Sequence, residues 1–444
     1  MRLASVTEPQ LPRLRTAATA VGLALASAGA AAQNVPDEIH VTGEAMDSEV
    51  TIEKFTAPLI DTPKSVTVIP QGLIEATGAT SLVDALRTVP GITFNAGEGG
   101  IPAGDNLKIR GFDAGSDVFI DGVRDAGTQT RDVFALEQIE VVKGPGSAYS
   151  GRGSSGGSVN LVTKKPLAED LFVANVAAGT DRFSRATLDT SYRIGDSMGF
   201  RLNLLRQDAD VPGRNEVSTS HWGIAPSLAF GIGKPTRVNL DFYRYETDDV
   251  PDYSIPYARN AANTAPAGEP VAVNRDSFYG LLNRDFQRTG ADIRTLTVER
   301  DFTSGITLSN TTRYGTTTNH YIVTNPDDGR ANVPNGFVLR NTKNRDSITT
   351  TTANSTSFSG MRMTGEVMHS FAFGFEASNE EMINRPYSVE SLFSGKRRHA
   401  TREFLQRSGR GRPRVELQLH DAREPESARS VGGHDHEIGE RHAR

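Results

Sequence analysis

The longest regular pattern in this chain is an alternation of apolar and polar residues that begins at Leu171 and continues for about two hundred residues. Residues 237–242 are typical, with an apolar side chain at every second position and charged or amide side chains between them. A period of two predicts β-strands with one apolar and one polar face. Such strands occur in soluble sandwiches and also in membrane barrels, where the apolar face meets lipid and the polar face lines the interior.

The lengths of the connections distinguish these two folds. Tight turns are predicted at 195–197, 233–235, 303–305 and 359–360, and they alternate with much longer segments at 209–220, 248–289 and 319–341. Outer-membrane barrels have short turns on the periplasmic side and long loops outside. We therefore predict nine antiparallel transmembrane strands between Leu171 and Ser378.

A different pattern precedes the strands, over residues 51–166. Short apolar runs around Val141 and Leu161 predict two buried strands joined by a glycine-rich crossing, and another strand ends at Pro70. Ser81 caps a helix with apolar spacings of three and four, which Pro90 and Gly91 end. Alternating helices and strands predict a small mixed α/β domain.

The glycine-rich crossing also matches, by its letters, a dinucleotide-binding motif at Gly151, Gly153 and Gly156. That motif must open a helix, whereas the residues after Gly156 form a strand pattern. A phosphate-binding loop would need Lys followed by Ser or Thr at its end, and Arg152 follows Gly151 instead. Nucleotide binding is therefore not expected.

Both ends of the chain differ from its middle. Residues 1–32 resemble a cleaved signal peptide, with Arg13 and Arg15, an apolar run, and small residues up to Ala32. Residues 33–50 form a polar tail. Residues 396–444 are rich in Arg, Glu and His without any strand period, so we interpret them as an aberrant, disordered tail after a truncation or frameshift near residue 395. A metal-binding role for its histidines is the alternative that we weighed.

The amino-acid composition excludes several kinds of site and partner. The 444 residues include no cysteine, which excludes disulfides and thiolate metal sites. The formal charge of −6 argues against nucleic acid as a partner. No stretch after the signal peptide is long and apolar enough for a membrane-spanning helix, so insertion would have to be as a barrel.

Several motifs together resemble the plug domain of TonB-dependent outer-membrane receptors. They are Ile109-Arg110-Gly111-Phe112, the segment 118–123, and the glycine-rich crossing. Gly104-Asp105-Asn106 and the segment 117–125 are most similar to the ferric-catecholate siderophore subgroup. The fold class implied is mostly β: a small mixed α/β plug domain over 51–166, followed by an incomplete antiparallel transmembrane β-barrel over 167–395. Complete plugged barrels have about 22 strands.

The resemblance also implies partners and a location. An alternating stretch before the plug is similar to a TonB box, which would add a strand to TonB. It consists of Glu38, Ile39, His40, Val41, Thr42 and Gly43. The expected partners are TonB with ExbB and ExbD, a ferric siderophore, and outer-membrane lipid, for a monomer in the cell outer membrane that is not an enzyme.

Ligand binding would need no directly bound cofactor or metal ligands in the protein, because a siderophore already surrounds its ferric ion with oxygen atoms. A ferric catecholate is anionic and aromatic, so arginines and aromatic rings suit it. The candidate ligand-binding residues are Arg110, Phe112, Arg124, Arg131 and Phe134. For each arginine, a plug-to-barrel salt bridge is the alternative. Phe134 stands where several relatives carry a tyrosine.

Two functions are therefore compared. The first is TonB-dependent uptake of a ferric siderophore, impaired by the missing second half of the barrel. The alternative is a secreted or surface β-rich binding protein or adhesin without energy coupling.

Overall fold

The computed structural model describes residues 50–51, 62, 64–95, 104–125, 127–146, 154–259, 266–327, 333, 336–365 and 367–389. The predicted signal peptide at 1–32, the predicted TonB box at 38–43 and the predicted tail at 396–444 lie outside these residues. Within the described ranges, no helix is long and apolar enough to cross a membrane.

The first domain is mixed α/β, as predicted. Its elements are β1 (Ser65–Pro70), α2 (Gln71–Thr77), α3 (Leu82–Leu86), β2 (Ile92–Phe94), β3 (Leu107–Ile109), β4 (Phe112–Asp113), β5 (Val118–Ile120), β6 (Val123–Arg124), β7 (Leu136–Lys143) and β8 (Gly157–Thr163). One sheet has the order β1-β7-β8-β5-β6, and β2, β3 and β4 form a second. The fully buried core includes Leu82, Leu107, Ile139 and Leu161.

The two strands predicted on either side of the glycine-rich crossing are β7 and β8, which pair antiparallel. Glycine is required where β8 begins, since a Cβ on Gly156 would lie 2.1 Å from the carbonyl oxygen of Ile109. This close approach brings β3, which precedes Arg110, against the start of β8.

The helices differ in part from the prediction. The side chain of Ser81 caps α3 by accepting from the amide of Asp84 at 3.1 Å, but α3 ends at Leu86 and not at Pro90. Helix α2 was missed, because its seven residues show little apolar period. Pro70 before it and Gly78 after it, in the left-handed conformation, are the signals that mark its ends.

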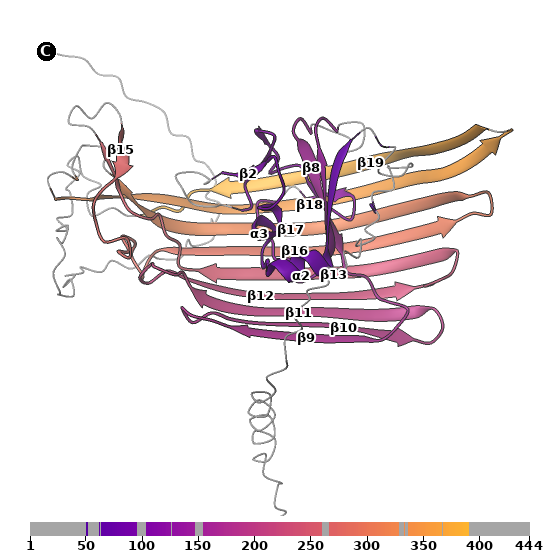
Figure 1. Cartoon of the computed structure of the whole chain (residues 1–444), viewed down its shortest axis with the longest axis horizontal. Coiled ribbons are helices and arrows are strands. Elements are labelled where there is room, and N and C mark those ends of the chain that lie inside the picture. Colours follow the sequence, from indigo (N-terminus) through magenta and orange to yellow (C-terminus); the bar gives the residue numbers. More distant parts are fainter. Residues whose placement is uncertain are drawn as a thin grey trace, which may run out of the picture. The chain divides into compact units, whose positions relative to one another are not determined.

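The second part of the described chain is a nine-stranded antiparallel sheet, which confirms the predicted strand number. Its strands are β9 (Leu171–Ala178), β10 (Ser184–Ile194), β11 (Met198–Asp210), β12 (Ser218–Phe230), β13 (Thr236–Asp249), β16 (Phe286–Asp301), β17 (Ile306–Asp327), β18 (Leu339–Thr364) and β19 (Val367–Arg385). They lie side by side in chain order, from β9 at one edge to β19 at the other (Figure 1). A small hairpin of β14 (Tyr257–Arg259) and β15 (Pro266–Pro270) lies in the connection from β13 to β16.

Among the strands that the structure describes, this sheet does not close on itself, since β9 and β19 each pair on one side only. The fold is therefore mostly β, with a mixed α/β domain followed by an incomplete barrel, as the sequence predicted. One predicted turn was wrong. Ser359 and Gly360 lie inside β18, which continues to Thr364, and the chain turns at Gly365 with φ 64°. The Ser-Gly pair resembled a turn, but regular pairing with β17 holds both residues in the strand.

The two faces of the sheet follow from contacts with the first domain. On β13, Tyr243 and Tyr245 stack against Phe134, so alternate residues such as Leu240 and Phe242 point outward. The inward face is polar and the outward face is apolar over much of its length, as the period of two predicted.

Candidate ligand site on the plug

Arg110 and Phe112 lie together at the tip of the β3–β4 hairpin. Arg110 has φ 51° and Gly111 has φ 84°, the conformation of a tight hairpin turn. The backbone amide of Arg110 donates to the carbonyl of Gly91 at 2.7 Å. Arg110 is exposed, and so is 56% of Phe112. The hairpin therefore presents a cation and an aromatic ring on one small projection.

Arg124 lies in the interior of the plug. It donates to the carbonyl of Ser116 and to the carboxylate of Asp117 at 3.2 Å, and its guanidinium lies 5.1 Å from the ring centre of Phe119. Burial raises the pKa of Asp117 and outweighs the nearby charge of Arg124. The alternative that we considered was a salt bridge to the barrel, but the partner of Arg124 is within the plug.

Arg131 is also buried and joins two plug loops. Its guanidinium contacts the carboxylates of Asp105 and Asp125, the second at 2.6 Å, and its amide donates to Asp105 at 3.1 Å. Burial alone would lower the pKa of Arg131, but the two carboxylates raise it above its usual value. This arginine therefore holds the loop that contains Asp105 against the loop 125–131.

Phe134 faces the sheet. Its ring centre lies 5.8 Å from that of Tyr243 and 6.5 Å from that of Tyr245. Gly223 on β12 makes room for it, since a Cβ there would lie 2.6 Å from the Phe134 ring. Phe134 thus forms an aromatic contact between the plug and the strands.

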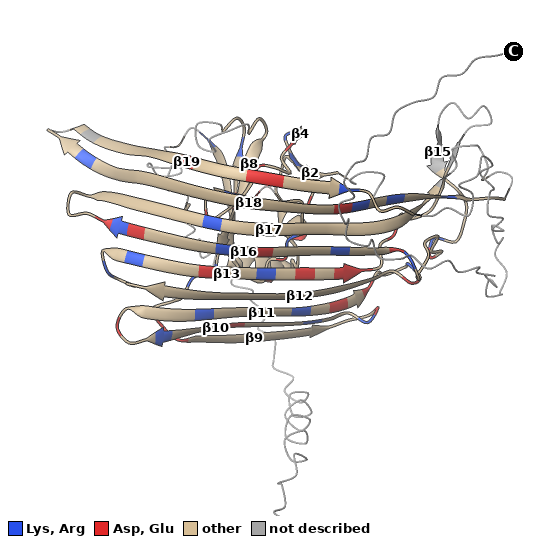
Figure 2. Ribbon diagram, turned by 180° about the vertical axis from the view of Figure 1, so that it is seen from behind, with Lys and Arg blue, Asp and Glu red and all other residues tan. Residues whose placement is uncertain are grey.

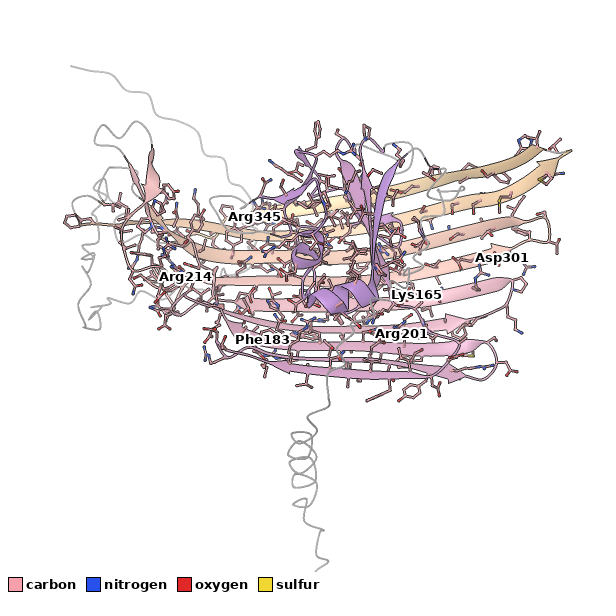
Figure 3. The ribbon with its side chains drawn as sticks, in the orientation of Figure 1. Lys165, Phe183, Arg201, Arg214, Asp301 and Arg345 are labelled. Atoms are coloured by element: carbon pink, nitrogen blue, oxygen red, sulfur yellow. The ribbon has the colours of Figure 1, made fainter. Side chains whose placement is uncertain are left out.

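Charged contacts that the sequence analysis did not identify also join the plug to the sheet. Lys165 lies 3.2 Å from Asp121 of the plug and 2.6 Å from Asp241 of β13, and Arg185 of β10 pairs with Asp132 at 2.8 Å. Lys165 is labelled in Figure 3. The sequence did contain a signal for these contacts. Charged residues occur at inward positions of the strands, where they need partners such as the plug.

Arg313 on β17 makes the most buried of these contacts. Its Nη1 donates to the carbonyl oxygens of Ile120 at 2.8 Å and Val123 at 3.1 Å, at the two ends of the β5–β6 turn. Gly127 packs against Thr317, four residues farther along β17 towards the long connections. The plug loop that contains Arg131 is therefore directed towards the end of the sheet where the long connections lie.

The five predicted ligand-binding residues thus lie in three different environments. Arg110 and Phe112 are exposed together, Arg124 and Arg131 are buried in separate ion pairs within the plug, and Phe134 contacts the strands. No group of three or more His, Cys, Asp or Glu residues suited to a metal ion occurs among the residues that the structure describes.

Comparison with known proteins shows which receptors this chain resembles. Residues 58–158 match the family model described as TonB-dependent Receptor Plug Domain. Outside this domain as well, the chain is similar to TonB-dependent siderophore receptors over about three quarters of its length. The fold of a plug domain with barrel strands agrees with this class.

The particular relatives are siderophore receptors. The chain is 42% identical over 337 residues to the probable TonB-dependent siderophore receptor PiuA of Acinetobacter baumannii, and 34% identical over 346 residues to the catecholate siderophore receptor Fiu of Escherichia coli K12. These alignments cover 76% and 74% of this chain, and the chain spans 45% of the length of each relative. The relatives named here are receptors, not enzymes, as was expected of this chain.

Solved structures of two of these receptors resemble this chain in fold. The crystal structure of PiuA superposes with a TM-score of 0.72, covering 76% of this chain and 48% of that chain. The closed form of Fiu, a ferric-catecholate import receptor, superposes with a TM-score of 0.71 at 32% identity, covering 77% of this chain and 50% of that chain.

Proposed function

We propose that this chain has the plug and barrel strands of a receptor for TonB-dependent uptake of a ferric siderophore across the outer membrane, with a catecholate as the favoured class of ligand, and that the open sheet impairs uptake by the chain alone. The observation that supports this most directly is the exposed pair of Arg110 and Phe112 on a plug of the matching family. A guanidinium attracts the anionic complex, and a ring packs against its aromatic groups. Similarity to Fiu favours catecholate over other siderophores.

The other three predicted residues receive a supporting role in this proposal. Arg124 and Arg131 already satisfy buried carboxylates, so a ligand would have to compete with those ion pairs. We assign them to shaping the plug loops, and Phe134 to seating the plug against β12 and β13. Ferric ion is cargo within its siderophore, and the protein supplies no ligands to it.

Energy coupling would follow from the N-terminal segment. Residues 1–32 direct secretion, and the stretch from Glu38 to Gly43 pairs as an added strand with TonB, which acts with ExbB and ExbD. Force on that stretch moves the plug, and the ligand passes. The same proposal includes a monomeric state and contact with outer-membrane lipid. It also includes the domain bounds 1–32, 33–50, 51–166, 167–395 and 396–444.

The test of the ligand site is binding of a ferric tris-catecholate to the full chain in detergent micelles. Arg110→Gln and Phe112→Ala should each weaken binding by about tenfold, the loss of one charge-assisted or aromatic contact. Arg87→Gln is the matched control, because Arg87 is 68% exposed on the same domain and pairs only weakly with Asp84 at 3.9 Å. Equal affinity in all three variants would refute the proposed site.

A second experiment separates uptake from the adhesin alternative. Deletion of residues 38–43 in the chain should abolish any energy-dependent accumulation of the iron complex and leave its binding unchanged. A passive surface binder would show no energy-dependent accumulation before the deletion and would bind equally well after it.

A further inference from the structure

The side chain of Glu140 lies in the interior of the plug and takes no part in the proposed ligand site. Glu140 stands in the middle of β7 and is fully buried. It accepts hydrogen bonds from the side-chain amides of Gln138 and Asn160, each at 2.8 Å. A buried carboxylate is costly unless donors surround it. The stability of this part of the plug therefore depends on the donors that reach Glu140.

Two further donors come from Thr51, which is distant in the sequence. The backbone amide of Thr51 donates to Oε1 of Glu140 at 2.5 Å, and the Thr51 hydroxyl donates to the same oxygen at 2.9 Å. We call this contact the Thr51 anchor. Since two of the four donors belong to Thr51, its departure would leave a buried carboxylate with only half of its hydrogen bonds.

The position of the anchor determines which strand of the plug is loaded first. Thr51 lies between the predicted TonB box, which ends at Gly43, and β1, which begins at Ser65. In the plug sheet as described, β1 is an edge strand, whereas β7 lies between β1 and β8. The chain is therefore attached to an inner strand before it enters the edge strand. While the anchor holds, a pull on the N-terminal segment acts on β7 and not on β1.

Hydrogen bonds continue from Glu140 to the strands of the large sheet. Asn160 on β8 donates to Oε2 of Glu140 and accepts from the backbone amide of Gly122 at 2.9 Å. Gly122 lies in the β5–β6 turn, and the carbonyl oxygens on either side of this turn accept from Arg313 of β17. The strands β8 and β17 are both labelled in Figure 2. A pull on Thr51 is therefore resisted by contacts that end on the barrel strands.

We propose that Glu140 is a positioning residue for energy coupling, which anchors Thr51 so that a pull on the N-terminal segment first loads β7 and the β5–β6 turn. Hydrogen bonds to a carboxylate are stronger than those between neutral groups, and burial protects them from water. Rupture of the Thr51 anchor is then the first step of a forced movement, and it transfers the load to β1. The inference rests on the proposed coupling to TonB and adds the residue at which force enters the plug.

The anchor is tested by single-molecule force spectroscopy of the full chain in non-ionic detergent micelles. The chain contains no cysteine, so Asp196→Cys, in an exposed turn, provides one attachment point and the N-terminus provides the other. We expect a first rupture that frees residues 52–64 before any strand unfolds. Its extension should be at most about 45 Å, the reach of that segment when fully extended.

Matched variants identify the contact that ruptures. Thr51→Val removes the hydroxyl donor and Glu140→Gln removes the charge, so each should speed the first rupture at constant force at least tenfold. Thr51→Ser keeps the hydroxyl and should keep the rate of the parent chain. Thr93→Val, at an exposed position on β2, is the control and should change nothing.

The later ruptures report the stability of the plug itself, and Thr51→Val should leave them unchanged, which a merely structural role of the contact would not. Equal first-rupture rates in Thr51→Val and Thr93→Val, or a first rupture that already includes β1, would overturn the proposal. Because Thr51 is exposed, its variants decide the question even where Glu140→Gln fails to fold.

Binding of ferric tris-catecholate in the same micelles keeps the two proposals separate, because the force measurement uses neither TonB nor an iron complex. The absence of iron-complex binding by the parent chain would contradict only the proposed function. The absence of a short first rupture would contradict only the Thr51 anchor.

Discussion

At the scale of single residues, buried arginines hold the plug together. Arg131 is 5% exposed and contacts two carboxylates, so its replacement by Met would leave Asp105 and Asp125 buried beside each other. We expect Arg131→Met to lower the free energy of unfolding of the plug by about 3–5 kcal/mol. Denaturant titration followed by hydrogen exchange of the 125–131 loop measures this. Arg87→Met, at an exposed pair, should change it by less than about 1 kcal/mol.

Asp121 makes the plug sensitive to acid. Burial opposes its ionisation, but Lys165, Arg313 and hydrogen bonds from Thr163 outweigh burial and hold the pKa of Asp121 below its usual value. A lowered folded-state pKa contributes stability that is present above the unfolded pKa of about 4 and is lost as the pH falls through the folded pKa.

The corresponding variant is Asp121→Asn, which should cost about 1–3 kcal/mol at pH 7, the value of hydrogen bonds to a charged group. The difference from the parent chain should shrink as the pH falls below about 4. Unfolding of the plug, measured at a series of pH values, tests this. A difference that stays constant down to pH 2 would contradict it. Asp196→Asn is the control, since Asp196 is 98% exposed in a turn.

At the scale of elements, the start of β8 determines where the β3–β4 hairpin lies. Gly156→Ala would place a Cβ 2.1 Å from the carbonyl oxygen of Ile109, a backbone atom that cannot turn away. We expect the hairpin to shift, with a loss of about 1–3 kcal/mol of plug stability and weaker binding of the ferric catecholate at Arg110. Gly115→Ala, whose nearest atom is the Asp113 carboxylate at 3.5 Å, should change neither. Equal behaviour of the two variants would show that the close approach is not needed.

At the scale of the whole molecule, the open sheet limits what these strands do alone. Within the described part of the chain, β9 and β19 each have one unpaired side, and 62% of Phe373 and 70% of Phe375 on β19 are exposed. Unpaired backbone groups are costly in lipid. We expect the chain, expressed alone, to give no heat-modifiable, protease-resistant band in the outer-membrane fraction, whereas the longer relative PiuA gives one. The appearance of such a band would contradict this expectation.

Much of the fold followed from local patterns. The period of two predicted nine strands, and strong turn residues placed three of the four predicted turns correctly. The local pattern failed at Ser359 and Gly360, where pairing with β17 overrides turn propensity. It also failed at α2, because a helix of seven residues is too short to show an apolar period. For the candidate ligand site, the sequence predicted five residues but could not tell which of the arginines are exposed.

The sequence by itself determined the class of the protein, because alternation, connection lengths and the plug motifs are local properties that each short segment carries. Tertiary structure alone decided that Arg124 and Arg131 are buried in ion pairs while Arg110 stays exposed, because burial depends on how the plug loops and strands pack and not on the presence of a nearby carboxylate. It also placed Arg313 and Lys165 between the plug and the sheet. Those arrangements arise from strand register, which aligns residues from separate strands across the sheet.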